Sequence, residues 1–131
     1  MMEYPNMHKD EMLNKKIWAV IGASSNKEKF GYKIFKKLEE KGYDVYGINP
    51  NVDKVDGKKI YKTVKDLPVK PDVVDFVVSP QITEGMLEDL KDMGIENLWF
   101  QPGSYRQSTV EKGEKLGFKL VYNDCVLRSL H

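Results

Sequence analysis

The chain has 131 residues, of which 40% are hydrophobic and 31% charged, and its formal net charge at pH 7 is +1. This length suits one domain, the balance excludes intrinsic disorder, and the small net charge gives no field that would recruit nucleic acid or an anionic membrane. No apolar run approaches the roughly 18 residues that cross a bilayer, and one cysteine with two histidines at opposite ends makes a zinc site improbable. We therefore expect a single cytoplasmic domain over residues 1–131, with no metal, no nucleic-acid partner and no membrane contact.

The first half of the chain alternates between strand and helix patterns. Residues 1–14 form an extension without the apolar core of a secretory signal, and they can form a helix. Ile17–Ile21 is apolar throughout, as in a central strand covered on both faces. A helix is predicted between Gly31 and Gly42 from an apolar stripe at helical spacing and from the glycine that follows it. The second strand is Asp44–Ile48, and 60–67 can hold a short strand and one helical turn.

The second half repeats the alternation. The third strand is Val73–Val78, and Ser79-Pro80 then supplies a capping hydroxyl and a proline for the first turn of a helix. The fourth strand is Asn97–Gln101, and the helix after it can begin at Ser104 or at Ser108, because both fit a capping box. The fifth strand is 118–122. We expect the strand residues Trp18, Trp99 and Phe100 to lie in the core or in a subunit contact rather than to stack on bases.

Strands that alternate with helices predict a parallel sheet with helices on both faces. Right-handed crossovers then favour an α/β, Rossmann-like, doubly wound sheet of five strands in the order 3-2-1-4-5. In such sheets the ligand binds beyond the carboxyl ends of the strands, beside the first strand. We place this crevice between Ile17–Ile21 and Asn97–Gln101.

Four loops follow the strands at this edge of the sheet. They are Gly22-Ala23-Ser24-Ser25, Asn49-Pro50-Asn51, Ser79-Pro80-Gln81-Ile82 and Gln101-Pro102-Gly103. These segments offer small, hydroxyl and amide groups and contain no carboxylate, which favours a nucleotide phosphate over a metal or an acid/base pair. Any loop between a strand and a helix is rich in glycine and serine, so the residue types alone leave phosphate binding an open question.

The first loop differs from the fingerprint of NAD-binding proteins. Gly22 and Gly31 bracket eight residues, which is a longer interval than the G-x-G-x-x-G spacing allows. The second strand ends at Asn49, where NAD-binding proteins place an acid that holds the ribose diol. An amide near Lys54, Lys58 and Lys59 tolerates a ribose that carries its own phosphate, as in NADP or coenzyme A.

The order and spacing of several short motifs resemble the small stand-alone CoA-binding proteins, which are related to the CoA-binding domain in the α subunit of succinyl-CoA synthetase. The resemblance extends over about 15–125 and is carried by these segments: Val20 to Ser24, Lys29 to Lys33, Gly42 to Val45, Asn49 to Asn51, Val73 to Val77, Trp99 to Gly103 and the region of Cys125. Two departures stand out. Gly31 replaces a frequent serine, and 123–127 lacks the basic residues that related proteins carry there.

The resemblance implies a Rossmann-like domain that holds CoA or an acyl-CoA, without catalytic or metal-binding residues. It implies that Gly22, Ala23, Ser24 and Ser25 lie against the pyrophosphate, with Lys29 and Lys33 as phosphate cations. Asn49 and Pro50 would border the nucleotide, Ser79, Pro80 and Ile82 would flank the adenine or pantetheine path, and Gln101 and Gly103 would lie near the opposite wall.

Several alternatives remain open at this point. The leading hypothesis is a binding, carrier or regulatory module, because the larger synthetase uses a phosphorylated histidine and this chain has no internal histidine. The second is an NADP-linked oxidoreductase or redox sensor, and the third is an interaction protein that has lost its ligand. Cys125 is either a reactive thiol or a small buried hydrophobic residue, and the chain can act as a monomer or a homodimer.

Overall fold

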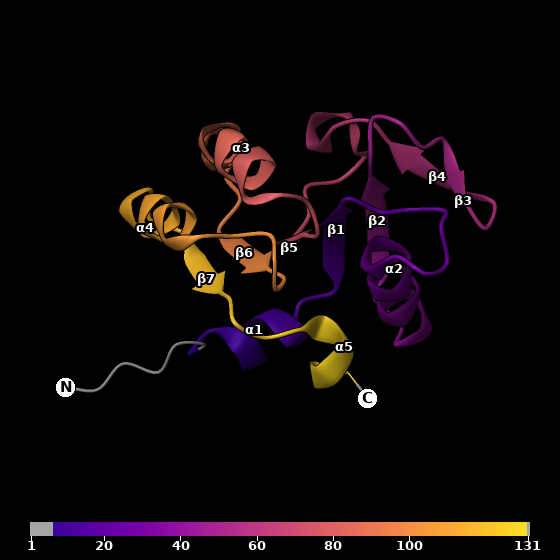
Figure 1. The fold of residues 1–131 in the computed structure, drawn as a ribbon, viewed down its shortest axis with the longest axis horizontal. Coiled ribbons are helices and arrows are strands. Elements are labelled where there is room, and N and C mark those ends of the chain that lie inside the picture. Colours follow the sequence, from indigo (N-terminus) through magenta and orange to yellow (C-terminus); the bar gives the residue numbers. More distant parts are fainter. Residues whose placement is uncertain (1–6, 131) are drawn as a thin grey trace.

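The computed structural model describes residues 7–130, which form one seven-stranded sheet with helices on both faces (Figure 1). The strands are β1 (Ile17–Ile21), β2 (Asp44–Ile48), β3 (Lys54–Val55), β4 (Lys58–Tyr61), β5 (Val73–Phe76), β6 (Asn97–Phe100) and β7 (Lys119–Val121). Their order is β3-β4-β2-β1-β5-β6-β7, and all neighbouring pairs are parallel except β3 and β4. The predicted Rossmann-like α/β class is therefore correct.

The predicted number and order of strands are wrong. β5 pairs with β1, whereas the sequence-based order placed it beyond β2. The position beside β2 belongs to β4, which pairs through Gly47↔Ile60 and Ile48↔Tyr61. With β4 included, the six parallel strands follow the order 3-2-1-4-5-6, so the winding still reverses beside β1. The crevice at that reversal is bordered by β5, and not by the Asn97–Gln101 segment as predicted.

The helices divide into two layers, and each layer packs on its own apolar core (Figure 1). The helices are α1 (Lys9–Leu13), α2 (Phe30–Glu40), α3 (Pro80–Asp92), α4 (Gln107–Lys115) and α5 (Val126–Ser129), with a 3₁₀ turn, η1 (Val64–Asp66). α1, α2 and α5 cover one face of the sheet, where Trp18 and Trp99 are fully buried with ring centroids 5.8 Å apart. α3, α4 and η1 cover the other face, where Phe100 is fully buried. The three aromatic residues are core residues, as predicted.

The start of α4 differs from both predicted serines. Its first residue is Gln107, because the Thr109 hydroxyl accepts a hydrogen bond from the backbone N–H of Arg106 at 3.1 Å. The Ser104 hydroxyl instead donates to the carbonyl oxygen of Gln101 at 2.7 Å, and the Ser108 hydroxyl donates to Glu84. Local spacing suggested Ser104 and Ser108 as caps, but both hydroxyls bind other partners and the helix is capped at Arg106.

Candidate functional site

Gly22 closes the turn that follows β1. Its φ of +101° lies in the region that favours glycine, and its N–H donates to the carbonyl oxygen of Ile48 at 2.9 Å. A Cβ on Gly22 would stand 2.8 Å from the carbonyl oxygen of Val77. The backbone of this loop therefore lies directly against the segment that follows β5, with no side chain between them.

The loop from Ser24 to Lys29 is held by a series of short polar contacts. The Ser24 hydroxyl accepts a hydrogen bond from the N–H of Asn26, whose side-chain oxygen accepts one from the N–H of Glu28, both at 3.0 Å. These contacts deliver the chain to the start of α2 at Phe30, and no side chain of residues 7–130 caps this helix. The uncapped first turn presents backbone N–H groups and the positive end of the helix dipole, a combination that suits an anion.

Gly31 makes the closest approach between α2 and the first loop. A Cβ at this position would stand 2.0 Å from the carbonyl oxygen of Gly22 and 3.4 Å from the backbone nitrogen of Ser24. The sequence alone indicates only that Gly31 lacks the hydroxyl of a serine. The structure gives a different reason, because no side chain fits at this position in the observed packing.

Asn49 joins the end of β2 to the first loop. Its side-chain nitrogen donates to the carbonyl oxygen of Ala23 at 2.9 Å, and its side-chain oxygen accepts from the N–H of Asn51 at 2.9 Å. Both polar atoms of the amide therefore have partners within the protein. The side chain therefore ties the loop after β2 to the loop after β1. Because it is an amide, the position at which NAD-binding proteins hold the ribose diol with an acid has no carboxylate here.

Ser79 begins α3, as predicted. Its hydroxyl accepts from the N–H of Ile82 at 3.4 Å, and Pro80 occupies the first helical position. The side chain of Ile82 is 53% exposed and lies one turn into the helix. The start of α3 thus offers an apolar surface beside a capped helix end.

The segment after β6 turns its first side chain inward. Gln101 is only 2% exposed, and its Nε2 donates to Oδ1 of Asp75 at 2.7 Å while its Oε1 accepts from the N–H of Val126 at 3.3 Å. Asp75 is fully buried on β5, on the same face as Val77, and no described group forms a hydrogen bond with its second oxygen. Burial raises the pKa of the Asp75 carboxyl well above its ordinary value, and the hydrogen bond from Gln101 partly opposes this shift.

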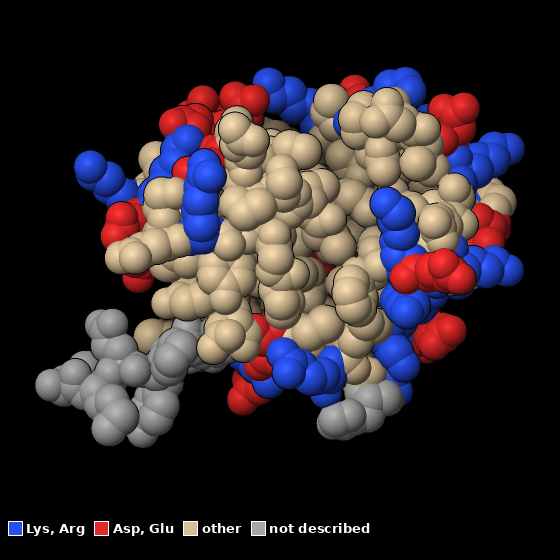
Figure 2. All heavy atoms as spheres, in the orientation of Figure 1, with Lys and Arg blue, Asp and Glu red and all other residues tan. Residues whose placement is uncertain are grey.

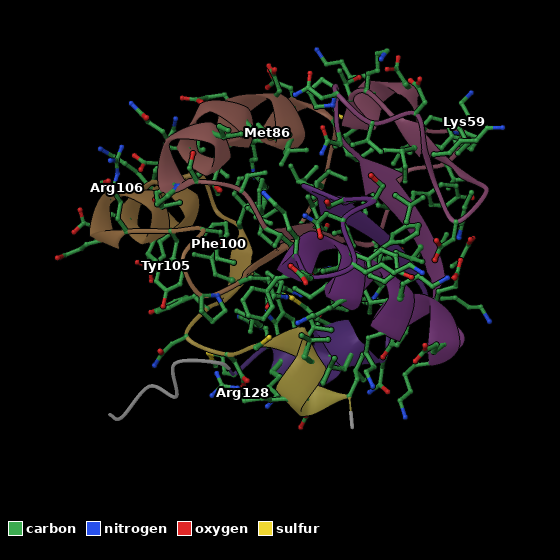
Figure 3. The ribbon with its side chains drawn as sticks, turned by 45° about the vertical axis from the view of Figure 1, so that its right-hand side comes forward. Lys59, Met86, Phe100, Tyr105, Arg106 and Arg128 are labelled. Atoms are coloured by element: carbon green, nitrogen blue, oxygen red, sulfur yellow. The ribbon has the colours of Figure 1, made fainter. Side chains whose placement is uncertain are left out.

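The rest of the β6–α4 loop packs against its neighbours. Tyr105 stacks on Phe100 with ring centroids 6.1 Å apart, and Arg106 reaches α3, where its Nε donates to Glu84 (Figure 3). Glu84 also accepts from the hydroxyls of Ser108 and Thr109. The hydrogen bond from Arg106, together with the weaker effects of these two hydroxyls, lowers the pKa of the Glu84 carboxyl. This cluster joins α3 to α4 and is structural.

Two cavities meet at the carboxyl edge of the sheet. The first, which we call the α2 cavity, has a volume of about 590 Å³ and is lined by Gly22, Ser24, Glu28, Lys29, Phe30, Gly31, Asn49, Val77, Val78, Ser79, Pro102, Gly103 and Ser104. The second, the α3 cavity, has a volume of about 410 Å³ and is lined by Ile21, Gly22, Ile48, Asn49, Pro50, Asn51, Lys62, Thr63, Val78, Ile82 and Met86. Gly22, Asn49 and Val78 line both cavities, so one extended ligand can reach from one to the other across Gly22.

Eight of the thirteen residues named from the sequence line these cavities: Gly22, Ser24, Lys29, Asn49, Pro50, Ser79, Ile82 and Gly103. The other five, Ala23, Ser25, Lys33, Pro80 and Gln101, line neither. Ala23 and Gln101 are buried, and Ser25 is exposed. Lys33 is also exposed, and its Nζ lies 5.6 Å from the centroid of the Phe30 ring.

The sequence reading missed several lining residues, and two of them are charged. Glu28 lines the α2 cavity, so this wall is not free of carboxylates even though the four predicted loops are. Lys62 follows β4, the strand that the sequence reading did not count, and it lines the α3 cavity. In Figure 2 charged side chains gather around the periphery of the molecule, and the central area, behind which Figure 1 places β1, β5 and β6, is largely uncharged.

Residues 7–130 contain no cluster of three or more His, Cys, Asp or Glu side chains arranged to hold a metal ion. None of the helices in this range has both the length and the apolar character that crossing a bilayer requires. Cys125 is partly buried and forms no disulfide within the described chain.

Comparison with known proteins places this geometry in context. A family model described as a CoA binding domain matches residues 16–131. The α subunit of the ADP-forming acetate–CoA ligase II of Pyrococcus furiosus is 30% identical over 128 residues, which cover 89% of this chain and 28% of that subunit. A second ADP-forming acetate–CoA ligase, from Methanocaldococcus jannaschii, is 36% identical over 78 residues, which cover 60% of this chain and 11% of that ligase. The chain thus spans a minor part of these curated relatives.

Solved structures of small proteins match it over almost their whole length. A conserved hypothetical protein from Pyrococcus furiosus has a TM-score of 0.82 and 35% identity, covering 87% of this chain and 98% of that one. A hypothetical protein from Pyrococcus horikoshii OT3 has a TM-score of 0.85 and 32% identity, covering 98% and 95%. The same arrangement of elements therefore occurs in chains of similar size.

Proposed function

The chain belongs to the CoA-binding domain family, and from this premise we propose that it binds coenzyme A or an acyl-CoA across the two cavities at the carboxyl edge of the sheet. It acts as a binding, carrier or regulatory module without catalysis of its own. The observation that carries the proposal is the pair of cavities joined at Gly22, which match a ligand with two ends and a charged centre.

The centre of the site suits a pyrophosphate. Gly22 and Gly31 leave the backbone bare, Ser24 supplies a hydroxyl, and Lys29 supplies a cation at the uncapped start of α2. Helix starts of this kind bind phosphate through backbone N–H groups and the helix dipole. The ADP-forming ligases that share the sequence pattern act with CoA according to their names, which supports CoA as the ligand.

The end of β2 argues against NAD. Binding of an unphosphorylated ribose diol relies on an acid at this position, and the chain has Asn49, whose amide is already bonded to Ala23 and Asn51. CoA needs no acid here, because its ribose carries a phosphate that an acid would repel. We therefore expect CoA to bind in preference to NAD.

A matched pair of neighbouring serines tests the location of the ligand. Ser24 lines the α2 cavity, whereas Ser25 is exposed and lines neither cavity. Ser24→Glu places a negative charge beside the pyrophosphate and is expected to weaken CoA binding at least tenfold in calorimetric titration, an effect of about 1.4 kcal/mol or more. Ser25→Glu introduces the same charge one residue away and is expected to change the affinity about twofold or less.

Unfolding curves of both variants without ligand show whether either substitution disturbs the fold. If Ser24→Glu keeps the wild-type affinity while the protein remains folded, the pyrophosphate does not lie at this loop. If neither the wild type nor Ser25→Glu binds CoA, the proposed function itself is wrong.

A further inference from the structure

The two cavities differ in the charges on their walls. The described residues that line the α3 cavity include one cation, Lys62, and no carboxylate. The α2 cavity has Lys29 on its wall, but it also has the carboxylate of Glu28. A group with two negative charges is therefore favoured in the α3 cavity and opposed by Glu28 in the α2 cavity.

The α3 cavity also has the mainly apolar lining that suits a nucleobase. Its apolar lining comes from Ile21 of β1, Ile48 of β2 and three later residues, Val78, Ile82 and Met86. Met86 lies on α3 in Figure 3. Asn51 and Thr63 add polar groups to this lining. A mainly apolar lining with a few polar groups is typical of small-molecule sites.

Lys62 is held against the wall of this cavity. Its Nζ donates to the carbonyl oxygen of Pro50 at 3.2 Å, and Pro50 lines the same cavity. The same ammonium lies 3.9 Å from a carboxylate oxygen of Asp53, whose side chain is 94% exposed. The contact with Asp53 is long and solvated and is therefore weak, so an incoming phosphate can replace it. The remaining N–H donors of the ammonium are available to such a ligand.

We infer that the α3 cavity holds the adenosine end of the ligand and that Lys62 binds its 3′-phosphate, so that Lys62 selects CoA over the same molecule without this phosphate. The inference rests on the proposed function, because it assigns a direction to the CoA bound there. The pyrophosphate lies at Gly22 and the start of α2, where Lys29 offsets the charge of Glu28, and the uncharged pantetheine arm occupies the rest of the α2 cavity.

The test compares CoA with dephospho-CoA by calorimetric titration at one fixed ionic strength, because exposed charge pairs are screened by salt. For the wild type we expect CoA to bind about tenfold more tightly than dephospho-CoA, because one charge-assisted hydrogen bond contributes free energy of about this size. In Lys62→Gln we expect this ratio to fall to about twofold or less while the affinity for dephospho-CoA stays the same, because only the phosphate partner is lost.

Two further variants make the test specific. Lys59→Gln removes the same charge from an exposed residue of β4 that lines neither cavity and lies well away from Met86 in Figure 3, so the ratio should stay at its wild-type value. Glu28→Gln should also leave the ratio unchanged. If the ligand instead bound in the opposite direction, Glu28→Gln would raise the ratio and Lys62→Gln would leave it unchanged.

The outcomes separate this inference from the proposed function. Equal affinities of the wild type for CoA and dephospho-CoA would overturn the assignment of Lys62 and leave CoA binding intact. A wild-type ratio that Lys62→Gln does not alter would do the same. Absence of binding by either compound would overturn both.

Discussion

The contact between Gly31 and the carbonyl oxygen of Gly22 makes a strong prediction about stability. Gly31→Ala adds one methyl group at a point where the Cβ would stand 2.0 Å from that oxygen. Contacts of a Cβ under 3.0 Å essentially do not occur, so the start of α2 and the loop must separate by at least about 1 Å. The obstacle is backbone and not the end of a flexible side chain, so rotation of a side chain cannot relieve it.

The expected cost is near the upper end of the range for overpacking, about 3 kcal/mol of the free energy of unfolding. Urea denaturation of the ligand-free protein measures this quantity. Gly85→Ala is the matched control, because Gly85 lies within α3, is exposed, and has no atom within 4 Å of its added Cβ. That variant should be about 0.5–1 kcal/mol more stable than the wild type, since alanine favours a helix over glycine.

The same separation moves the loop that the proposed pyrophosphate site uses. Gly31→Ala should therefore weaken CoA binding even under conditions in which it remains folded, whereas Gly85→Ala should not. A Gly31→Ala protein whose free energy of unfolding lies within about 0.5 kcal/mol of the wild type, the usual range for a neutral surface change, would refute this reasoning about the packing.

Three further predictions concern buried or bridging groups. Burial raises the pKa of Asp75, so the free energy of unfolding of the wild type should fall as the pH rises above the ordinary value of 3.8. Asp75→Asn should lack this fall, so in urea denaturation its stability relative to the wild type should increase with pH. Hydrogen bonds, above all the one from Arg106, lower the pKa of Glu84, so the stability that its carboxylate contributes should be lost as the pH falls below the ordinary value of 4.5. Glu84→Gln should therefore be less stable than the wild type at pH 7 and nearly equal to it in acid. Ser79→Ala removes the cap of α3 and should lower the free energy of unfolding by about 0.5–1 kcal/mol, as measured by thermal or urea unfolding. An unchanged free energy of unfolding would show that the long 3.4 Å contact does not stabilise the helix.

The sequence predicted best those elements whose signals are local. Ile17–Ile21 and Asp44–Ile48 have the predicted bounds, because each is an apolar or alternating run ended by a turn residue. The end of α2 before Gly42 and the cap at Ser79 were also correct, since both depend on the chemistry of one residue.

The strand order failed because the short strand expected within 60–67 was not counted among the strands of the sheet. β4 is short and polar, and of its four residues only Ile60 is buried, so its pattern did not distinguish a sheet strand from a strand in a loop. A local signal was nevertheless present, because Asp56-Gly57 has positive φ at both residues, the geometry of a two-residue hairpin turn for which Asp-Gly is a preferred pair. This hairpin turn predicts a strand directly after Gly57, which is β4, and Lys62 is the first residue after that strand.

The site was predicted at the level of loops better than at the level of side chains. The carboxyl ends of parallel strands meet at one edge, so topology alone brings the four loops together. The direction of each side chain depends on its neighbours, and this is why Gln101 points inward to Asp75 and Ala23 lies in the core. Glu28 lies outside the four loops, and only the folded path of the loop before α2 brings it to the cavity.

The most direct test of the account is a calorimetric titration of the wild-type protein with CoA, NADP and NAD under one buffer condition. The account predicts that CoA binds at least tenfold more tightly than either dinucleotide, a difference of about 1.4 kcal/mol or more. Binding of NADP or NAD as tight as that of CoA, or no binding of CoA at all, would contradict it.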